Sequence, residues 1–224
     1  MTKLSIVIPV KNESENVSLC QAMLLPFQQL GHEVIIVDGG SADDSVSKAQ
    51  WADHVVISEP GRAIQMNAGA ALSQGDILWF LHVDSVVSCT ALKTILAVVE
   101  HSQWGFFNVV LSGRHWLLRV VEWMMNWRSK WTGIATGDQG LFLTRALFDE
   151  LGGFAGIPLM EDVELCTRLK KMKVKPGRIN DTIKTSSRKW EKGGVVSTIF
   201  LMWKIRFLYA LGRSPDQLVK LYYR

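Results

Sequence analysis

The sequence predicts an α/β fold with a mostly parallel central sheet and helices on both faces. Four apolar, strand-like runs, at residues 4–10, 34–37, 55–57 and 76–81, alternate with helix-like segments. Runs without polar alternation are typical of parallel strands that are covered on both faces. Each run ends in polar or glycine-rich residues, and ligands of such sheets bind beyond the carboxyl ends of the strands. The sequence therefore predicts a binding site at this edge of the sheet.

The first hundred residues keep a regular alternation of strands and helices. Gly31 and Gly75 follow two of the helix-like segments, and glycine often ends a helix. Repeated strand–helix–strand units of this length form parallel sheets. In order, the pattern predicts strand 4–10, helix 15–30, strand 34–37, helix 44–51, strand 55–57, helix 62–73, strand 76–81 and helix 90–100.

The alternation changes after residue 100. The pattern there predicts strand 104–112, a tryptophan-rich helix at 114–131, strand 140–144, and helices 146–151 and 161–173. A stretch rich in Lys, Arg and Ser follows, and then an apolar helix near residues 195–211. A chain of 224 residues can bury one sizeable core. We therefore predict a single domain over residues 1–224 with a basic and apolar, helical C-terminal tail at 176–224.

Charge is unevenly distributed along the chain. Residues 1–100 contain 5 Lys and Arg against 11 Asp and Glu, whereas residues 101–224 contain 20 against 10. A basic second half favours an anionic partner, such as a phosphorylated substrate or a membrane surface, although a solvated surface is the alternative for any single run. No recognition helix, zinc motif or RNP motif is present in the sequence, so nucleic acid is not an expected partner.

Cysteine content and the N-terminus predict the cellular location. Cys20, Cys89 and Cys166 are odd in number and lack metal-ligand spacing, which is typical of reduced thiols in a cytoplasmic protein. The chain enters a strand by Leu4, so no signal peptide is expected.

Two segments suit a ligand that contains phosphates. In Asp38-Gly39-Gly40-Ser41 the glycines allow close approach of the backbone, and Asp38 can accept hydrogen bonds from a base or ribose. The alternative is a helix N-terminus capped by Ser41 or Asp43. Arg62 is predicted at a second helix N-terminus, where the cation and the amide dipoles together suit a diphosphate. An ordinary surface arginine is the alternative there.

The strand at 76–81 ends in His82-Val83-Asp84. Asp84 is a hard oxygen ligand suited to Mg²⁺ or Mn²⁺, which take their remaining ligands from waters and substrate phosphates. His82 would be a weak ligand that favours Mn²⁺, and its alternative is a structural histidine.

Three carboxylates crowd the predicted start of a helix, at Glu161, Asp162 and Glu164. The helix dipole favours anions at this position, which is a sufficient structural reason for them. The functional interpretation is that one of them is a general base that faces the site.

Together these residues resemble the family 2 glycosyltransferases of the GT-A fold, which have a Rossmann-like central sheet. The resemblance runs from Leu4 to about Arg168. Each matching segment is weak alone, but their order and spacing are specific. The segments are Ser5-Ile6-Val7-Ile8-Pro9 with Asn12-Glu13, Val37-Asp38-Gly39-Gly40-Ser41, residues 62–69, residues 75–84, Gly137-Asp138-Gln139-Gly140, and Gly152-Gly153-Phe154 followed by Glu161-Asp162.

The resemblance implies an inverting, metal-dependent transfer of one sugar from a nucleotide-diphosphate sugar to an acceptor hydroxyl. It implies a nucleotide-sugar-binding half at residues 1–100, an acceptor half at 101–175, and Mn²⁺ or Mg²⁺ as cofactor. The roles that it implies are Pro9, Glu13 and Asp38 around the base and ribose, Arg62 and Asn67 near the diphosphate, Asp84 with His82 on the metal, Asp162 as the catalytic base, and Asp138 and Glu161 on the acceptor side.

Three residues or segments depart from the family pattern. His82 stands where the D-x-D motif has its first acid, which puts the metal's affinity and identity in doubt. Gly39 stands where many relatives carry a second Asp, so one nucleotide contact is absent. Residues 186–190, Ser-Ser-Arg-Lys-Trp, match the Q-x-x-R-W signature of processive members only loosely, which favours transfer of a single sugar.

Two other classes of protein remain as alternatives. A non-catalytic protein that binds nucleotide sugars or a membrane surface is compatible with the weakened metal motif. A sugar nucleotidyltransferase fits less well, because it usually needs a Gly-rich, Lys-bearing loop after the first strand, and this chain has Lys11-Asn12-Glu13-Ser14 there.

The tryptophan-rich helix predicts where the acceptor comes from. Tryptophans flanked by cations suit the membrane interface, and the apolar part of the tail is too short to span a bilayer, which takes about 20 apolar residues. A peripheral contact with the inner face of the membrane and a lipid-linked acceptor are therefore expected. Packing of these residues on the sheet or across a homodimer is the alternative. The helical stripe consists of Trp116, Val120, Trp123, Trp127 and Trp131.

Overall fold

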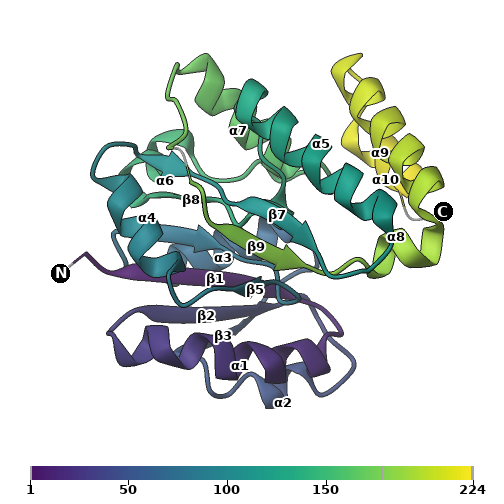
Figure 1. The fold of residues 1–224 in the computed structure, drawn as a ribbon. Helices are drawn as coiled ribbons and strands as arrows, with labels where there is room; N and C mark the ends of the chain where they lie inside the picture. The colour runs from purple at the N-terminus through teal and green to yellow at the C-terminus, as the bar shows by residue number, and fades with distance from the viewer. Residues whose placement is uncertain (1, 178, 223–224) are drawn as a thin grey trace.

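A computed structural model describes residues 2–177 and 179–222 and confirms the predicted α/β fold, with a mostly parallel sheet and a helical C-terminal segment. The main sheet has six strands in the order β3-β2-β1-β4-β8-β6 (Figure 1). Its parallel part consists of β1 (Leu4–Val10), β2 (Glu33–Asp38), β3 (His54–Ile57) and β4 (Ile77–Phe80). The strands β8 (Phe142–Thr144) and β6 (Trp104–Gly105) extend it by antiparallel pairing.

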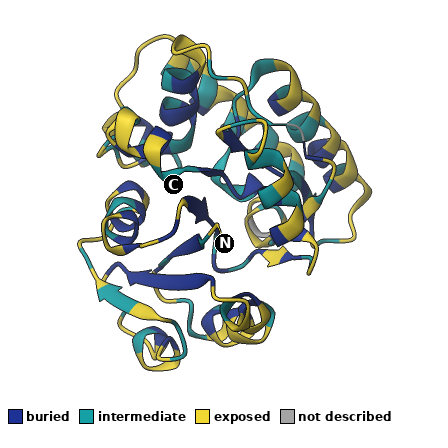
Figure 2. Cartoon of the chain, turned by 90° about the vertical axis from the view of Figure 1, so that its left-hand side faces the viewer, coloured by how far each residue is buried: buried dark blue, intermediate teal, exposed yellow. Residues whose placement is uncertain are grey.

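The strands β1, β2 and β4 are buried because their two faces contribute to two different cores, whereas the edge strand β3 is partly exposed (Figure 2). Ile6 and Ile8 of β1 pack in one core, and Val7, which points the opposite way, packs in the other. Residues of α1 (Ser14–Gln29) and α4 (Ala91–Val99) line the first core. Residues of α3 (Arg62–Leu72), α6 (Arg145–Leu151) and α7 (Glu161–Lys171) line the second. The short helix α2 (Ser45–Lys48) follows β2 and contacts α1.

The predicted strand at 104–112 is wrong as one element. Its first residues form β6 in the main sheet, and Asn108–Leu111 form β7 in a second, three-stranded sheet ordered β5-β9-β7. The run crosses between the sheets at Phe106 and Phe107, which pack in opposite cores. A continuous apolar run indicates that its residues are buried but does not indicate which strand they pair with. The sequence therefore did not show that residues 104–112 divide between two sheets.

The C-terminal segment contributes more than the predicted helix. The strand β9 (Thr182–Thr185) lies between β5 (Val86–Val87) and β7 in the small sheet, pairing antiparallel with β5 and parallel with β7. Three helices follow, α8 (Arg188–Gly193), α9 (Val195–Ala210) and α10 (Pro215–Tyr222). Figure 1 shows α9 beside α5 (Trp116–Thr132), on the side of the molecule where the chain ends. The described residues include no helix that is long and apolar enough to cross a membrane.

The central position of β9 gives a stability prediction. Ile183 is fully buried in the first core, whereas Lys184, its neighbour on the same strand, is exposed. We expect Ile183→Ala to lower the free energy of unfolding by about 2–5 kcal/mol, because it leaves a cavity in a close-packed core. Lys184→Ala should change it by less than about 0.5 kcal/mol. Urea denaturation measures both values, and equal effects of the two substitutions would contradict the central role of β9.

Candidate active site

Two adjoining cavities lie at the edge of the main sheet where polar residues follow the ends of β1 and β4. The first, of about 730 Å³, is here called the polar cavity, and the second, of about 410 Å³, the apolar channel. The polar cavity is lined by the loop after β1, the start of α3, the residues after β4, and α8. The apolar channel is lined by α5, the start of α7 and α9. Arg62, His82 and Asp138 line both cavities and so form a shared wall.

The polar cavity contains opposite charges brought from distant parts of the chain. Arg188 of α8 places its Nη2 atom 3.2 Å from Oε2 of Glu13 and 3.6 Å from Oδ2 of Asp84. Pro9 lines the same cavity. Lys189 also lines it, and burial together with the charge of Arg62 lowers the Lys189 pKa to about 8. The C-terminal segment therefore supplies two cations to a cavity whose carboxylates come from the first half of the chain.

Two residues predicted to bind the donor have structural contacts and line neither cavity. Asp38 is buried and accepts hydrogen bonds from the backbone N–H groups of Gly40 and Ser41, at 2.9 and 2.8 Å, so it holds its own turn together. Asn67 exchanges two hydrogen bonds with the backbone of Phe154, at 2.8 and 2.9 Å. Both residues thus hold the loops around the site in position.

Gly39 has a packing reason to be glycine. A Cβ atom at this position would lie 3.0 Å from the side chain of Gln65. The Gln65 amide donates to the carbonyls of Val10 and Val37, both at 2.8 Å, and thereby ties the ends of β1 and β2 together. Gly39 departs from the family pattern at a position where the Gln65 side chain occupies the space that a larger residue would need.

The Asp162 carboxylate is held in position by two backbone N–H groups. One of its oxygens accepts the N–H of Gly137 at 2.7 Å, and the other accepts the N–H of Val163 at 2.6 Å. Glu161 is buried, and its Oε1 atom lies 3.9 Å from Nη1 of Arg62. Both carboxylates line the apolar channel.

Glu164 lies outside the lining of both cavities. It forms an (i, i+4) ion pair with Arg168, with an Nη2–Oε2 distance of 2.7 Å. The helix dipole and this ion pair together explain why residue 164 is acidic. Asp162 and Glu161, which line the apolar channel, therefore remain as the candidate bases.

His82 and Asp138 form a pair on the shared wall. The Nδ1 atom of His82 lies 3.2 Å from Oδ1 of Asp138. The Gly137 backbone approaches the other side of the ring so closely that a Cβ atom there would lie 2.6 Å from Nε2 of His82. Because residue 137 is glycine, its backbone can lie against His82 while its N–H donates to Asp162. The same turn places Asp138 beside His82.

The carboxylates on the two sides of this loop have opposite pKa shifts. Removal from water raises the pKa of Asp162 and outweighs its two backbone hydrogen bonds, which lower it. The pKa of Glu161 is also raised, by removal from water and by the charge of Asp162. Removal from water acts to raise the pKa of Asp138, but the hydrogen bond and charge of His82, together with the Arg62 charge, outweigh it and lower this pKa. Carboxyl groups with such separated pKa values are typical of acid–base sites.

The residues around Asp84 fit a divalent cation only if the donor completes its ligands. Among residues 2–177 and 179–222, no three His, Cys, Asp or Glu side chains are grouped so that they could hold a metal ion. His82, the predicted weak ligand, pairs with Asp138, and Asp84 pairs with Arg188. Mg²⁺ and Mn²⁺ are often held by one or two carboxylates, with waters and substrate phosphates as the other ligands. Asp84 and its neighbours therefore fit a divalent cation that binds together with a phosphorylated ligand, whose phosphates supply the missing ligands.

Several residues of the two cavities were missed by sequence reasoning. Arg188 and Lys189 lie in a segment that was considered only as a processivity signature, and its basic pair beside Trp190 was the available signal. Arg128 and Arg206 line the apolar channel, from α5 and α9. The sequence pointed to both only as cations of a membrane interface, because their place in a cavity depends on how α9 lies against α5.

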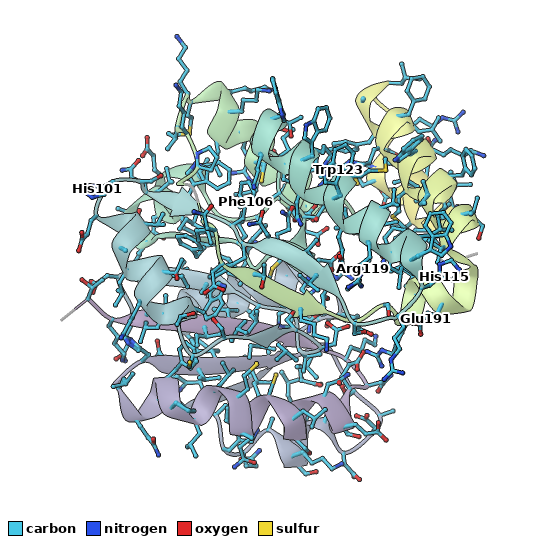
Figure 3. The ribbon with its side chains drawn as sticks, in the orientation of Figure 1. His101, Phe106, His115, Arg119, Trp123 and Glu191 are labelled. Carbon is cyan, nitrogen blue, oxygen red and sulfur yellow. The ribbon has the colours of Figure 1, made fainter. Side chains whose placement is uncertain are left out.

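Two helices expose large apolar side chains next to the apolar channel. Figure 3 labels Trp123 on α5, beside α9. Trp123 and Trp127 stack with ring centroids 6.1 Å apart and line the channel entrance together with Trp203 of α9. The predicted stripe therefore does not pack on the sheet, because Leu118 and Val121 occupy the inner face of α5 instead. The exposed apolar face consists of Trp116, Val120, Trp123, Trp127 and Trp131 on α5 and Val196, Phe200, Trp203, Phe207 and Leu211 on α9.

Residues 5–157 match the model of Glycosyl transferase family 2, and the chain belongs to this family. Among curated proteins, it is 26% identical over 152 residues to the uncharacterized glycosyltransferase YibD of Escherichia coli (strain K12), covering 62% of this chain and 43% of that protein. It is 28% identical over 161 residues to the undecaprenyl-phosphate 4-deoxy-4-formamido-L-arabinose transferase of Proteus mirabilis (strain HI4320), covering 64% and 48%. The chain spans about half the length of the curated relatives it matches.

Solved structures agree with this fold. The mannosyltransferase PcManGT from Pyrobaculum calidifontis, in complex with GDP-Man and Mn²⁺, has a TM-score of 0.68 at 18% identity, covering 99% of this chain and 69% of that one. TarS of S. aureus in complex with UDP has a TM-score of 0.67 at 16% identity, covering 82% and 60%. The predicted GT-A fold is confirmed.

Proposed function

We propose that this protein transfers one sugar, with inversion, from a nucleotide-diphosphate sugar to an acceptor hydroxyl. The observation that carries this proposal is the meeting of the two cavities at Arg62, His82 and Asp138. The polar cavity suits the charged donor, and the apolar channel brings Asp162 to the same wall from the other side. Family membership supports a transfer of this kind.

The chemistry follows from the positions of the charged groups. Asp162 takes the proton of the acceptor hydroxyl while the oxygen forms a bond with the anomeric carbon. The bond from that carbon to the diphosphate breaks on the opposite face, and the nucleoside diphosphate leaves with the electron pair. Arg62, on the shared wall, and Arg188 and Lys189 place positive charge where the leaving diphosphate develops its negative charge. Glu161 keeps Arg62 in position, and Glu13 does the same for Arg188.

A divalent cation would add to this charge when bound. Asp84 would hold it, with the donor phosphates as further ligands, and it would neutralise the departing diphosphate. The solved neighbours with bound Mn²⁺ or Mg²⁺ support this part of the proposal. His82 stays beside Asp138 and acts on its pKa.

The acceptor side is the second part of the proposal. One curated relative is named for an undecaprenyl phosphate substrate, which supports a lipid-linked acceptor. The exposed apolar face on α5 and α9 supports a cytoplasmic protein bound peripherally to the inner face of a membrane. A homodimer that covers this face is the competing possibility.

The rival interpretation is a non-catalytic protein that binds nucleotide sugars or a membrane surface. An enzyme of this class should slowly hydrolyse its donor when the acceptor is absent. We therefore expect release of UDP or GDP from a panel of UDP- and GDP-sugars with Mn²⁺ or Mg²⁺ present. Tight donor binding without any release would favour the rival.

The base assignment predicts the effect of Asp162→Asn. This change keeps the shape of the side chain but removes the proton acceptor and one of the two backbone hydrogen bonds, because an amide nitrogen cannot accept. We expect turnover to fall about 10²–10⁴-fold while donor affinity stays near that of the wild type. The raised pKa of Asp162 adds a pH signature. The base acts when deprotonated, so wild-type kcat/KM should fall as pH drops through a pKa above about 3.9, the usual Asp value.

Two neighbours serve as controls in the same assay. Glu164→Gln should keep near-wild-type turnover, because Glu164 pairs with Arg168 away from the cavities. Glu161→Gln should act mainly through Arg62 and change donor affinity more than the pH profile. Collapse of turnover in Glu161→Gln with a functional Asp162→Asn would assign the base to Glu161 instead.

The metal proposal predicts a cation effect that requires the nucleotide. Mn²⁺ alone should leave the melting temperature of the protein unchanged, whereas Mn²⁺ with UDP or GDP should raise it above the value for the nucleotide alone. Asp84→Ala should abolish this extra shift. The exposed carboxylate of Asp44 offers a control, and Asp44→Ala should keep the shift. His82→Asp places a carboxylate where the D-x-D motif has its first acid, so it should keep the shift and favour Mg²⁺ more by adding an oxygen ligand. A full metal-linked shift in Asp84→Ala would rule out Asp84 as the anchor.

Membrane contact gives a prediction for the exposed apolar face. We expect weak binding to anionic vesicles that decreases with salt, because screening weakens attraction between exposed charges. Trp123→Ala combined with Trp127→Ala should reduce this binding in co-sedimentation without unfolding the protein. Leu19→Ala is the control, since Leu19 is 71% exposed on α1, far from this face in the fold. Absence of vesicle binding at low salt, with a concentration-dependent dimer in solution, would favour the homodimer.

A further inference from the structure

The apolar channel combines a hydrocarbon-like wall with a reactive end. The apolar side chains that line it include Val121 and Met124 of α5 and Ile199 and Ile205 of α9. The same channel reaches Glu161 and Asp162 at the start of α7. It is therefore continuous from the exposed apolar face to the candidate base.

The channel also contains two arginines that form no close salt bridge in the described residues, although the charge of Asp162 acts on one of them, Arg128. Arg128 of α5 and Arg206 of α9 both line it, and neither forms a salt bridge within the described parts of the chain. The Nε–H of Arg128 is buried and has no hydrogen-bond partner, whereas its Nη2 donates to the Ser129 hydroxyl at 3.2 Å. This Nε atom is closed to solvent and so also to a ligand, and Arg128 therefore contributes its positive charge to the channel and not this donor.

The other charged groups of the channel are already engaged. Arg62 faces Glu161, His82 faces Asp138, and Asp162 accepts two backbone N–H groups. The cations of the channel without a close salt bridge in the described residues are therefore Arg128 and Arg206, and Arg128 shares its charge with Asp162. Guanidinium groups match the geometry of phosphate oxygens, and two of them on an apolar wall suit a phosphate that is joined to a hydrocarbon chain.

We propose that the apolar channel binds the acceptor as an anionic amphiphile, in which a phosphate joins a hydrocarbon chain to the part that bears the accepting hydroxyl. The phosphate lies between Arg128 and Arg206, and the hydrocarbon chain extends toward Trp123, Trp127 and Trp203 at the channel entrance. The hydroxyl then reaches Asp162. This inference rests on the proposed sugar transfer and specifies its acceptor.

Binding of simple probes separates the two parts of this proposal. The probes are dodecyl phosphate, butyl phosphate and dodecyl maltoside, each below its critical micelle concentration and without vesicles, so that insertion into a lipid surface does not contribute. In isothermal titration calorimetry, the Kd of dodecyl phosphate should be at least tenfold lower than that of butyl phosphate, which lacks the long chain. It should also be at least tenfold lower than that of dodecyl maltoside, which lacks the anionic group. Equal affinity for dodecyl and butyl phosphate would overturn the role of the chain, and equal affinity for dodecyl phosphate and dodecyl maltoside would overturn the role of the phosphate.

Matched variants test the residues. Arg128→Gln with Arg206→Gln should weaken dodecyl phosphate binding about tenfold or more, while Arg114→Gln with Lys204→Gln, which removes two exposed positive charges near the same helices, should not. Met124→Trp should fill the channel and block the probe, whereas Val120→Trp, on the exposed side of α5, should not. Equal effects within either pair would contradict binding in the channel.

Affinity for UDP and GDP, measured on every variant, identifies which claim fails. Intact nucleotide affinity in Arg128→Gln with Arg206→Gln and in Met124→Trp shows that the fold and the polar cavity are preserved. If the wild-type protein binds a nucleotide and hydrolyses a sugar donor but does not bind dodecyl phosphate, the acceptor inference is wrong and the transfer proposal stands. If it neither binds a nucleotide nor hydrolyses a donor, the transfer proposal is wrong, and dodecyl phosphate binding alone would not restore it.

Discussion

The two backbone hydrogen bonds to Asp162 are the constraint on which the site depends. They join the first turn of α7 to the Gly137 loop, which in turn lies against His82 at the end of β4. A carboxylate held from both sides cannot rotate away, yet each of its oxygens keeps a lone pair that can accept a proton. Removal from water raises its pKa in spite of these bonds, which makes it a better base when it is deprotonated. The fold thus fixes the position of this group through the two hydrogen bonds and raises its proton affinity by removing it from water.

The division into a polar cavity and an apolar channel follows from which elements build each. The carboxyl ends of β1 and β4 supply Glu13 and Asp84, and α8 returns to supply Arg188 against them. The helices α5 and α9, in contrast, lie beside each other outside the main sheet (Figure 1), and residues of both belong to one apolar cluster. Charge is therefore concentrated where a diphosphate would lie, and apolar surface lies where a lipid would arrive. The C-terminal segment takes part in both.

The sequence predicted the first half of the fold well because parallel strands buried on both faces leave a clear apolar pattern. It also predicted that Arg62 and Asp84 meet, since polar residues after parallel strands lie at one edge, and both line the polar cavity. Asp138 and Asp162 do not follow parallel strands, and only the family resemblance singled them out. The strand β9 was missed because Thr182–Thr185 alternates buried and exposed residues within a polar stretch and pairs with strands about 75 and 95 residues away along the chain. The contacts of Asp38 and Asn67 could not be read from their motifs, because each depends on a backbone conformation or on a loop far along the chain.

A crystal structure with UDP or GDP and Mn²⁺ tests the central claim most directly. The claim is that the donor and the acceptor meet at the wall formed by Arg62, His82 and Asp138. The nucleotide should occupy the polar cavity, with its diphosphate beside Arg62 and Asp84 and with Arg188 turned from Asp84 toward the phosphates. The apolar channel should stay open up to Asp162. A diphosphate found in the apolar channel, or a nucleotide bound away from Glu13 and Asp84, would contradict this account.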